Sequence, residues 1–400
     1  RTGISAATNV SKVFCSFLFT RPLTLYITNK WTERNQHYIT QAKPRTENIS
    51  PCRPKNRFVF IKIPKTGSST VGTMLERYGY RRDLHFAVPK IPSHSFPMGR
   101  RYRFADPALV FQWNLTDRGG VPVWPALGGF HILVNHARYN RSLLEALIPR
   151  AVYFTIIREP GARSESFFRY FLYQQKVPHT ANEDPLEVFM RDPHVRSRAI
   201  ITRYKWNTHF RNGQMFMLGL NPGAYDNTTA VEAVIGFLSQ SMDLVMLNEY
   251  FDESLLLLKR LMCWDFQDIV YISKAVGRAT QNRTGISADL RDKLRSWNGA
   301  DNALYRHFNR TFWGKVRSYG PGFGQDLETF RALKESTTRA CMAQGSRVWD
   351  WHNSSYWQMP ANASRKCQDL VRDDKAWVKL IRSRMQAKSK NFIKYRNEFN

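Results

Sequence analysis

The clearest structural signal in the chain lies at residues 58–70, which read Phe58-Val59-Phe60-Ile61-Lys62-Ile63-Pro64-Lys65-Thr66-Gly67-Ser68-Ser69-Thr70. The first six residues form a short, β-rich apolar run that is typical of a buried strand. The remaining seven contain proline, glycine and hydroxyl side chains, and they predict a turn. Residues 71–78 then continue as a helix. The stretch therefore predicts a strand, a turn and a helix in direct succession.

The same pattern recurs along the chain. Further apolar runs predict strands at residues 130–134, 152–157 and 244–247. Helices are expected at residues 141–147, 162–173 and 251–262, and the chain beyond Asp289 is expected to be mainly helical. Strands that alternate with helices predict an α/β fold with a central parallel sheet covered by helices on both faces.

The 400 residues are expected to hold one large domain with a segment on each side. Residues 1–55 read as a polar, irregular lead-in or stem. Residues 56–345 read as the α/β domain, and residues 346–400 as a basic, aromatic C-terminal extension. Inside the domain, residues 89–129 are rich in proline, glycine and aromatic residues, which predicts a long loop that carries function or acts as a lid.

The net charge of +28 points to an anionic partner: a nucleic acid, a membrane surface or a small anionic ligand. The cationic residues are scattered through the chain, without the spacing of a zinc finger, an RNP motif or a basic zipper. General basicity with a local anion site is therefore favoured over nucleic-acid binding.

Glycosylation signals suggest a secretory route. Sequences that fit Asn-x-Ser/Thr begin at Asn9, Asn48, Asn114, Asn140, Asn227, Asn282, Asn309, Asn353 and Asn362. Chance would supply only about half as many. The 5 cysteines contain no CxxC pair, which argues against a zinc site, and their odd number leaves one thiol free or paired outside the chain.

A membrane anchor is expected upstream of this sequence. Residues 13–27 are the nearest to an apolar span, but Arg21 and Pro22 interrupt them, and a spanning helix needs about 20 apolar residues. The sequence begins at Arg1 rather than at a methionine.

The turn at residues 64–70 has the composition of an anion site. A glycine-containing turn that opens a helix presents backbone N–H groups at the positive end of the helix dipole. Lys65 adds a charge, and Ser68, Ser69 and Thr70 add hydroxyl groups. The ATP-binding loop has its lysine after the last glycine, whereas Lys65 precedes Gly67. The alternative interpretation of the turn is ordinary helix capping.

A second anion site is predicted where the strand at residues 152–157 meets the next helix. Arg158 follows this strand directly, in place of an aspartate that would hold magnesium, which also argues against a kinase. Because ligands of open parallel sheets bind beyond the carboxyl ends of the strands, Arg158 and Ser166 can converge on a second phosphate. Arg163 and Arg169 can instead lie on a solvated helix face, the interpretation favoured for Arg169.

Taken together, these motifs resemble those of Golgi carbohydrate sulfotransferases, and most closely those of the galactose 3-O-sulfotransferases. The resemblance lies in residues 58–70, 84–89, 135–139, 158–170, 248–259, 263–264, 304–309 and 312–313. It is strongest at residues 248–264, whereas residues 88–130 match poorly and the last fifty residues hardly at all. Pro64 stands where close relatives often carry histidine.

The resemblance implies a P-loop-like three-layer sandwich, the sulfotransferase fold, and the donor 3'-phosphoadenosine-5'-phosphosulfate (PAPS), with 3'-phosphoadenosine-5'-phosphate (PAP) as the product. Residues Lys65, Thr66, Gly67, Ser68, Ser69 and Thr70 would hold the 5'-phosphosulfate. Arg158 and Ser166 would hold the 3'-phosphate. No metal is required. The acceptor would be a terminal β-galactose on a glycolipid or glycoprotein, and the location the Golgi lumen, with a type II membrane anchor.

His136 is the candidate general base, because it follows a predicted strand and its position resembles that of the base in uronyl 2-O-sulfotransferases. An imidazole titrates near pH 6.5 and can take a proton from a sugar hydroxyl. The rival bases are acids in residues 249–253, which instead look like the start of a helix, and then His85. Trp113 and Trp124 are expected either to stack on a galactose ring or to anchor the long loop at the surface.

Three other functions stay open at this point. Within the enzyme class, the alternative is uronyl 2-O-sulfotransfer on a glycosaminoglycan. Outside this class, a polyanion-binding module would use the basic surface itself, and a small-molecule kinase would use the same kind of sheet.

Overall fold

The structure is a computed structural model that describes residues 52–90, 110–112, 114–204, 210–272, 276–277, 286–349 and 354–399. Almost all of the predicted lead-in lies outside the described residues, and so do residues 91–109 and Trp113 of the predicted loop at residues 89–129. Within the described ranges, no helix is both long enough and apolar enough to cross a membrane.

The core of the molecule is a parallel sheet. Its strands are β1 (Phe58–Ile61), β2 (Ile132–Leu133), β3 (Val152–Ile157) and β4 (Leu244–Leu247), in the order β2-β1-β3-β4. Phe58 pairs with Ile132 on one side and with Val152 on the other, and Phe154 pairs with Leu244. All strand residues except Val152 are buried, which explains why the strands read as continuous apolar runs rather than alternating patterns.

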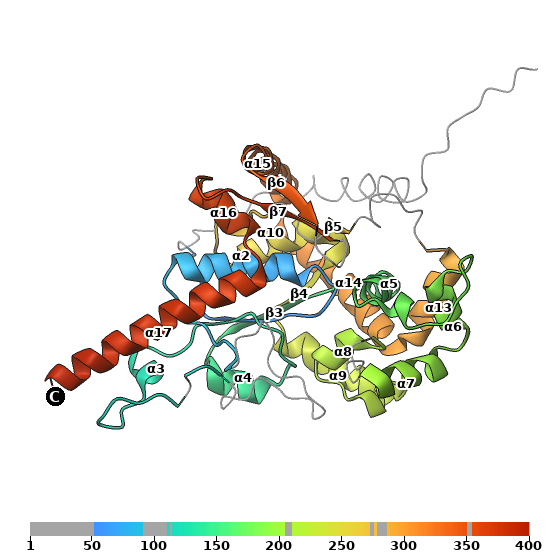
Figure 1. Ribbon diagram of the computed structural model, residues 1–400, viewed down its shortest axis with the longest axis horizontal. Helices are drawn as coiled ribbons and strands as arrows, with labels where there is room; N and C mark the ends of the chain where they lie inside the picture. The colour runs from blue at the N-terminus through green and yellow to red at the C-terminus, as the bar shows by residue number, and fades with distance from the viewer. Residues whose placement is uncertain are drawn as a thin grey trace, which may run out of the picture. The chain divides into compact units, whose positions relative to one another are not determined.

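Helices cover both faces of this sheet, so the predicted α/β class is confirmed. In the first half of the domain they are α2 (Ser68–Arg81), α3 (Val123–Ala126), α4 (Arg141–Leu147), α5 (Pro160–Tyr170), α6 (Pro185–Arg191), α7 (Pro193–Tyr204), α8 (Gly213–Met217) and α9 (Thr228–Ser241). In the second half they are α10 (Phe251–Met262), α11 (Phe266–Ile269), α13 (Ala288–Trp297), α14 (Gly299–Tyr319), α15 (Phe323–Met342), α16 (Arg365–Val371) and α17 (Asp374–Phe399). Short 3₁₀ turns lie at η2 (Tyr173–Gln175), η4 (Pro222–Ala224) and η5 (Asn248–Tyr250). In Figure 1, α2 and α10 lie above the sheet, and α4, α8 and α9 lie below it.

Two helices begin earlier than the sequence predicts, each for a local reason. α2 begins at Ser68, because Gly67 adopts a left-handed conformation that ends the preceding turn. α5 begins at Pro160, since the carboxylate of Glu159 accepts hydrogen bonds from the N–H groups of Gly161 and Ala162. Proline at the first helical position needs no N–H partner.

A second, three-stranded sheet forms in the C-terminal part, in the order β5-β7-β6. Its antiparallel strands are β5 (Val276–Gly277), β6 (Ser346–Trp349) and β7 (Ser354–Gln358). Disulfides join Cys52 to Cys263 and Cys341 to Cys367. The remaining cysteine, Cys15, lies outside the described residues.

The last helix, α17, packs on α2 and contributes to the main core. Trp377 is fully buried, and Ile381 and Met385 are each 2% exposed. Figure 1 shows α17 lying beside α2, the helix that directly follows β1. Residues that the sequence suggested only as an extension thus help to form the hydrophobic core around β1 and α2.

Candidate active site

Polar residues follow every strand of the parallel sheet. They are His136 after β2, Lys65 after β1, Arg158 after β3, and Asn248 with Glu249 after β4. The chain passes from β1 to β2 on one side and then returns to β3 on the other side of β1, so the strand order reverses at β1. Ligands of open α/β sheets bind at this point, beyond the carboxyl ends of the strands. This edge of the sheet is therefore the candidate active site.

Hydrogen bonds join the two predicted anion motifs directly. Nη1 of Arg158 donates to the carbonyl oxygen of Lys65 at 3.3 Å. From the end of β4, Nδ2 of Asn248 donates to the carbonyl oxygen of Thr66 at 3.1 Å. The structure thus brings the two motifs together at one place, as the strand positions suggested.

Gly67 is required by the geometry of the loop. Its φ of 77° lies in the left-handed region, and a Cβ atom at this position would lie 2.5 Å from Nδ2 of Asn248. Gly67 is also the N-cap residue of α2, and no side chain caps this helix. An uncapped helix start leaves first-turn N–H groups available to an anion, so the structure does not support the alternative of ordinary side-chain capping.

The hydroxyl groups of the loop divide into two kinds. Those of Thr66 and Ser68 are buried and donate to the carbonyl oxygen of Ile63, so they shape the loop. Ser69 is exposed and Thr70 is half-buried. Hydroxyl contacts to a ligand are therefore expected from Ser69 and Thr70, whereas Thr66 and Ser68 offer their backbone N–H groups.

Lys65 is oriented by an aromatic ring that the sequence did not single out. Its Nζ atom lies 3.6 Å from the ring centroid of Tyr170, which is within the range of a cation–π interaction. Tyr170 is the last residue of α5, so this helix contacts the lysine of the first motif as well as following Arg158.

Arg158 is held at its backbone by a pair of hydrogen bonds. Oε1 of Gln214 accepts from the Arg158 N–H group at 2.8 Å, and Nε2 of Gln214 donates to the Arg158 carbonyl oxygen at 2.8 Å. Burial lowers the pKa of the Arg158 guanidinium, whereas the carboxylate of Glu249 raises it. An arginine stays charged under such shifts. Ser166 is half-buried on α5, the helix that begins two residues after Arg158.

Arg163 and Arg169 lie in different environments in the structure. Arg163 is fully buried, and it donates to the carbonyl oxygens of Pro64 at 3.3 Å and Phe210 at 3.2 Å. A solvated helix face is therefore wrong for Arg163. Its position four residues before buried Phe167 places both on one face of α5, and this spacing was the available sequence signal. Arg169 does lie near the surface, paired with Glu165 and Asp184.

His136 lies half-buried beside the end of β1. Its Nδ1 atom is 2.7 Å from the carbonyl oxygen of Lys62. Since a carbonyl can only accept, Nδ1 carries the hydrogen and the lone pair of the neutral ring is on Nε2. This is the tautomer that a general base requires when its second nitrogen faces the substrate.

The rival acids have structural partners. The oxygens of Glu249 accept from the N–H group of Glu159 at 2.9 Å and from the hydroxyl of Tyr305 at 3.0 Å. Desolvation raises the pKa of Glu249, an effect that these bonds oppose. Asp252 accepts from Lys334 at 2.6 Å, and both Asp252 and Glu253 lie in the first turn of α10. The prediction that this run begins a helix with acids in its first turn is confirmed.

His85 and Trp124 belong to the core. Nδ1 of His85 lies 3.0 Å from the carbonyl oxygen of Gly129, and burial lowers the pKa of this histidine. Trp124 is 1% exposed and stacks on Phe130. Trp124 therefore neither offers a face to a sugar nor anchors the loop at the surface, and both predictions for it are wrong.

Comparison with known proteins agrees with this geometry. A sequence model of the family Galactose-3-O-sulfotransferase matches residues 15–373, which include all the residues above. Galactosylceramide sulfotransferase of Bos taurus is 34% identical over 304 residues, which cover 74% of this chain and 66% of that protein. The Mus musculus galactosylceramide sulfotransferase is 33% identical, covering 77% and 69%. Galactose-3-O-sulfotransferase 3 of Homo sapiens is also 33% identical, covering 73% and 65%.

These matches span about two thirds of the length of each relative. Residues 15–373, the range that matches the family, include the loop after β1, the loop after β3 and the family-specific block that begins α10. The sequence resemblance, the parallel sheet and the polar residues at its carboxyl edge lead to one conclusion. The chain belongs to the galactose-3-O-sulfotransferase family.

Proposed function

We propose that this protein transfers a sulfonate group from PAPS to O3 of a terminal β-galactose. The observation that supports the proposal most is the hydrogen bond between Arg158 and the carbonyl of Lys65, at the carboxyl edge of the sheet. It joins two cationic motifs on neighbouring strands, and a donor that carries charge at both its 5' and 3' positions needs two such motifs. The β1–loop–α2 unit also supports a P-loop-like sulfotransferase fold.

The 5'-phosphosulfate would bind at the start of α2. There the backbone N–H groups of residues 66–69, the positive end of the helix dipole and the ammonium of Lys65 are complementary to its charge. Arg158 and Ser166 would bind the 3'-phosphate, since a guanidinium offers a fork of donors and a serine a hydroxyl. These two residues would position the donor without taking part in bond breaking.

The chemical step is an in-line displacement at sulfur. Nε2 of His136 takes the proton from the acceptor hydroxyl as its oxygen forms a bond to sulfur. The bond between sulfur and the bridging oxygen of the 5'-phosphate breaks, and PAP leaves with the bonding electrons. Lys65 and the loop N–H groups stabilise the charge that grows on that bridging oxygen. The proton on His136 is then lost to solvent.

The acceptor is inferred from the names of the relatives, which are a galactosylceramide sulfotransferase and galactose-3-O-sulfotransferases. The deciding experiment incubates the protein with labelled PAPS and a panel of β-galactosides, galactosylceramide and desulfated heparan. We expect label at O3 of galactose and little on heparan. Label only on heparan would favour uronyl 2-O-sulfotransfer. Salt-sensitive heparan binding without any transfer or PAP binding would favour a polyanion-binding module.

We further infer a Golgi lumenal location with a type II anchor upstream of this chain. The support is the density of glycosylation signals, of which Asn114 and Asn362 lie at exposed positions. Digestion of the protein from mammalian cells with an N-glycan amidase should lower its apparent mass. An unchanged mass would contradict this location.

A further inference from the structure

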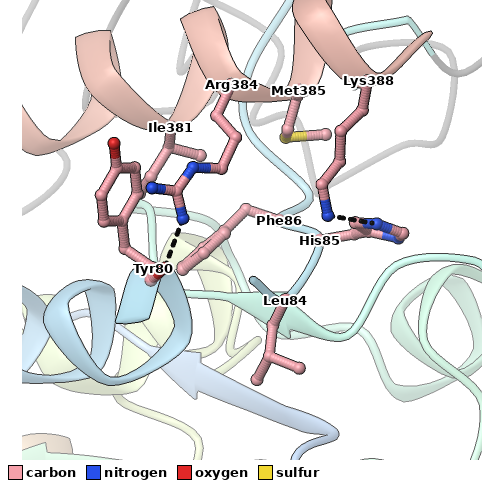
Figure 2. Close-up of a pocket in the computed structure, with 8 residues that line it drawn as sticks. All are labelled: Tyr80, Leu84, His85, Phe86, Ile381, Arg384, Met385 and Lys388. Carbon is pink, nitrogen blue, oxygen red and sulfur yellow. Dashed lines mark hydrogen bonds between the residues drawn. The ribbon is translucent and has the colours of Figure 1, made fainter. Parts of the chain in front are cut away.

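Helix α17 lies beyond residues 15–373, the range that matches the family. It is nevertheless built into the main core, with Trp377 fully buried against Tyr80 of α2 at a ring-centroid distance of 5.4 Å. Figure 2 shows Ile381, Arg384, Met385 and Lys388 of α17 facing Tyr80, Phe86 and His85. A helix outside the family match thus covers the helix that carries the proposed donor site.

Lys62 connects α17 to the sheet through its side chain. The side chain is 2% exposed, and Nζ lies 2.7 Å from Oδ2 of Asp374, the first residue of α17. It passes beside α2 at Gly72, where a Cβ atom would lie 3.3 Å from Nζ. A buried ammonium is strongly destabilising without a charged partner. The position of Lys62 therefore depends on Asp374.

The backbone of the same residue contacts the candidate base. The carbonyl oxygen of Lys62 accepts the hydrogen bond from Nδ1 of His136 at 2.7 Å. This bond selects the tautomer in which Nε2 can accept a proton. The ammonium group of Lys62 thus contacts α17, and its backbone carbonyl oxygen contacts His136.

We propose that Lys62 is a positioning residue, and that its ion pair with Asp374 makes α17 part of the scaffold that orients His136. The inference rests on the proposed role of His136 as the general base. It assigns to the C-terminal helix a role in proton transfer, in addition to its role in the core.

The donor loop has separate supports, so the effect is expected on turnover rather than on donor affinity. Arg163 holds the carbonyl of Pro64, and Asn248 holds the carbonyl of Thr66. Neither bond involves Lys62 or Asp374. A small displacement of the Lys62 carbonyl would misalign His136 while these bonds keep the loop in place.

The first test is Asp374→Asn, which keeps the shape of the side chain and removes its charge. We expect turnover at saturating substrates to fall by about tenfold or more, because small misplacements of a catalytic group are costly. The dissociation constant of PAP should stay within about twofold of the wild-type value. A loss of turnover without a loss of PAP affinity distinguishes a positioning residue from a residue that binds the nucleotide. Assays are run well below the melting temperature of each variant, measured in parallel.

The matched control is Asp83→Asn. Asp83 also pairs with α17, through Lys388 at 2.5 Å and Arg384 at 3.7 Å, but it lies at the end of α2 away from the strand ends. Turnover should be retained in this variant. Equal turnover in the Asp83→Asn and Asp374→Asn proteins would overturn the proposal, and so would a parallel loss of PAP affinity in Asp374→Asn.

Two further variants keep the test decisive. Lys62→Met removes the ammonium and leaves Asp374 at a helix N-terminus, where a carboxylate is stabilised by the helix dipole. Lys62→Met should lose turnover and keep its PAP affinity, and this result is expected even if Asp374→Asn does not fold. Wild-type turnover in Lys62→Met would overturn the proposal.

His136→Ala separates the role of His136 as the general base from the positioning role of Lys62 and Asp374. Wild-type turnover in His136→Ala overturns both the proposed base and this inference. An inactive His136→Ala beside a fully active Asp374→Asn overturns this inference alone.

Discussion

The candidate base is oriented by a backbone carbonyl rather than by a carboxylate. The carbonyl oxygen of Lys62 accepts from Nδ1 of His136, and a carbonyl does not ionise. The neutral imidazole is therefore held in the tautomer that has its lone pair on Nε2. This arrangement separates the role proposed for His136, which is proton transfer, from the role proposed for Lys65, which is charge stabilisation.

Replacement of His136 by alanine tests that separation. Turnover should fall by about 10²-fold or more, the contribution typical of a general base. PAP affinity should stay nearly unchanged, because His136 is assigned no phosphate contact. Lys65→Ala should weaken both PAP binding and turnover. The control is His194→Ala, which removes an exposed histidine of α7. Wild-type turnover in His136→Ala would show that the base is another residue, with Glu249 the first to examine.

Gly67 allows a prediction with an internal control, because Gly120 has the same φ of 77°. Alanine at either position should cost roughly 1–2 kcal/mol for the left-handed conformation. Only at position 67 would the new Cβ also meet the Asn248 side chain, since nothing lies within 4 Å at Gly120. Gly67→Ala should therefore reduce both the thermal stability and the PAP affinity of the protein. Gly120→Ala should reduce only its thermal stability. Unchanged PAP affinity in Gly67→Ala would contradict the assignment of the loop to the donor.

Among the elements, the residue before β2 is a half-buried histidine, His131, whose ring contacts that of the buried His85. Nδ1 of His131 accepts from the backbone N–H of His85 at 3.2 Å. Nε2 of His85 lies 3.2 Å from Nζ of Lys388 on α17, as Figure 2 shows. Burial lowers the pKa of His85, and burial likewise lowers the pKa of His131 to about 4. Both rings are therefore neutral in the folded protein near neutral pH.

This pair predicts that the fold is less stable in acid. The unfolded chain takes up protons on both histidines as the pH falls through about 6.5, whereas the folded chain does so only at lower pH. The free energy of unfolding should thus be highest above pH 6.5 and decrease between about pH 6.5 and pH 4. Urea denaturation across this range measures it. His131→Gln should flatten the dependence and the exposed control His194→Gln should not. An equal slope in all three proteins would contradict the prediction.

The sequence predicts elements well where they are buried on both sides. β3 and β4 are short apolar runs that end just before Arg158 and Asn248, and their predicted bounds agree with the structure. β2 is only two residues long, against five predicted, and Phe130 packs on Trp124 instead of joining the ladder. Apolar composition marks burial, but it does not tell a strand residue from a residue packed beside the strand.

The sequence patterns did not predict the polar contacts between residues that are far apart in the chain. The ion pair of Lys62 and Asp374 joins residues 312 positions apart. Arg163 similarly reaches the carbonyl of Pro64 across 99 positions. Local spacing can place a residue on a buried face, but it does not identify the partner that a buried charge finds there.

For the whole molecule, the excess of positive charge has a partly internal explanation. Several arginines donate hydrogen bonds to backbone carbonyl oxygens, namely Arg57, Arg77, Arg138 and Arg163. Such bonds satisfy a guanidinium without cancelling its charge, so they leave a net charge of +28 without requiring a nucleic-acid surface. The charge that we propose to bear on function is the local cluster of Lys65 and Arg158 at the sheet edge.

The central claim is that this cluster binds one nucleotide through both its 5' and 3' phosphates, and calorimetry with PAP and AMP tests it most directly. Charge-assisted hydrogen bonds are worth about 1.5–3 kcal/mol each, so PAP should bind more than about tenfold tighter than AMP. Arg158→Ala should remove most of this difference. Arg169→Ala, which removes an arginine of α5 that is paired with Glu165 and Asp184, should preserve it. Equal affinities of the wild-type protein for PAP and AMP would contradict the account.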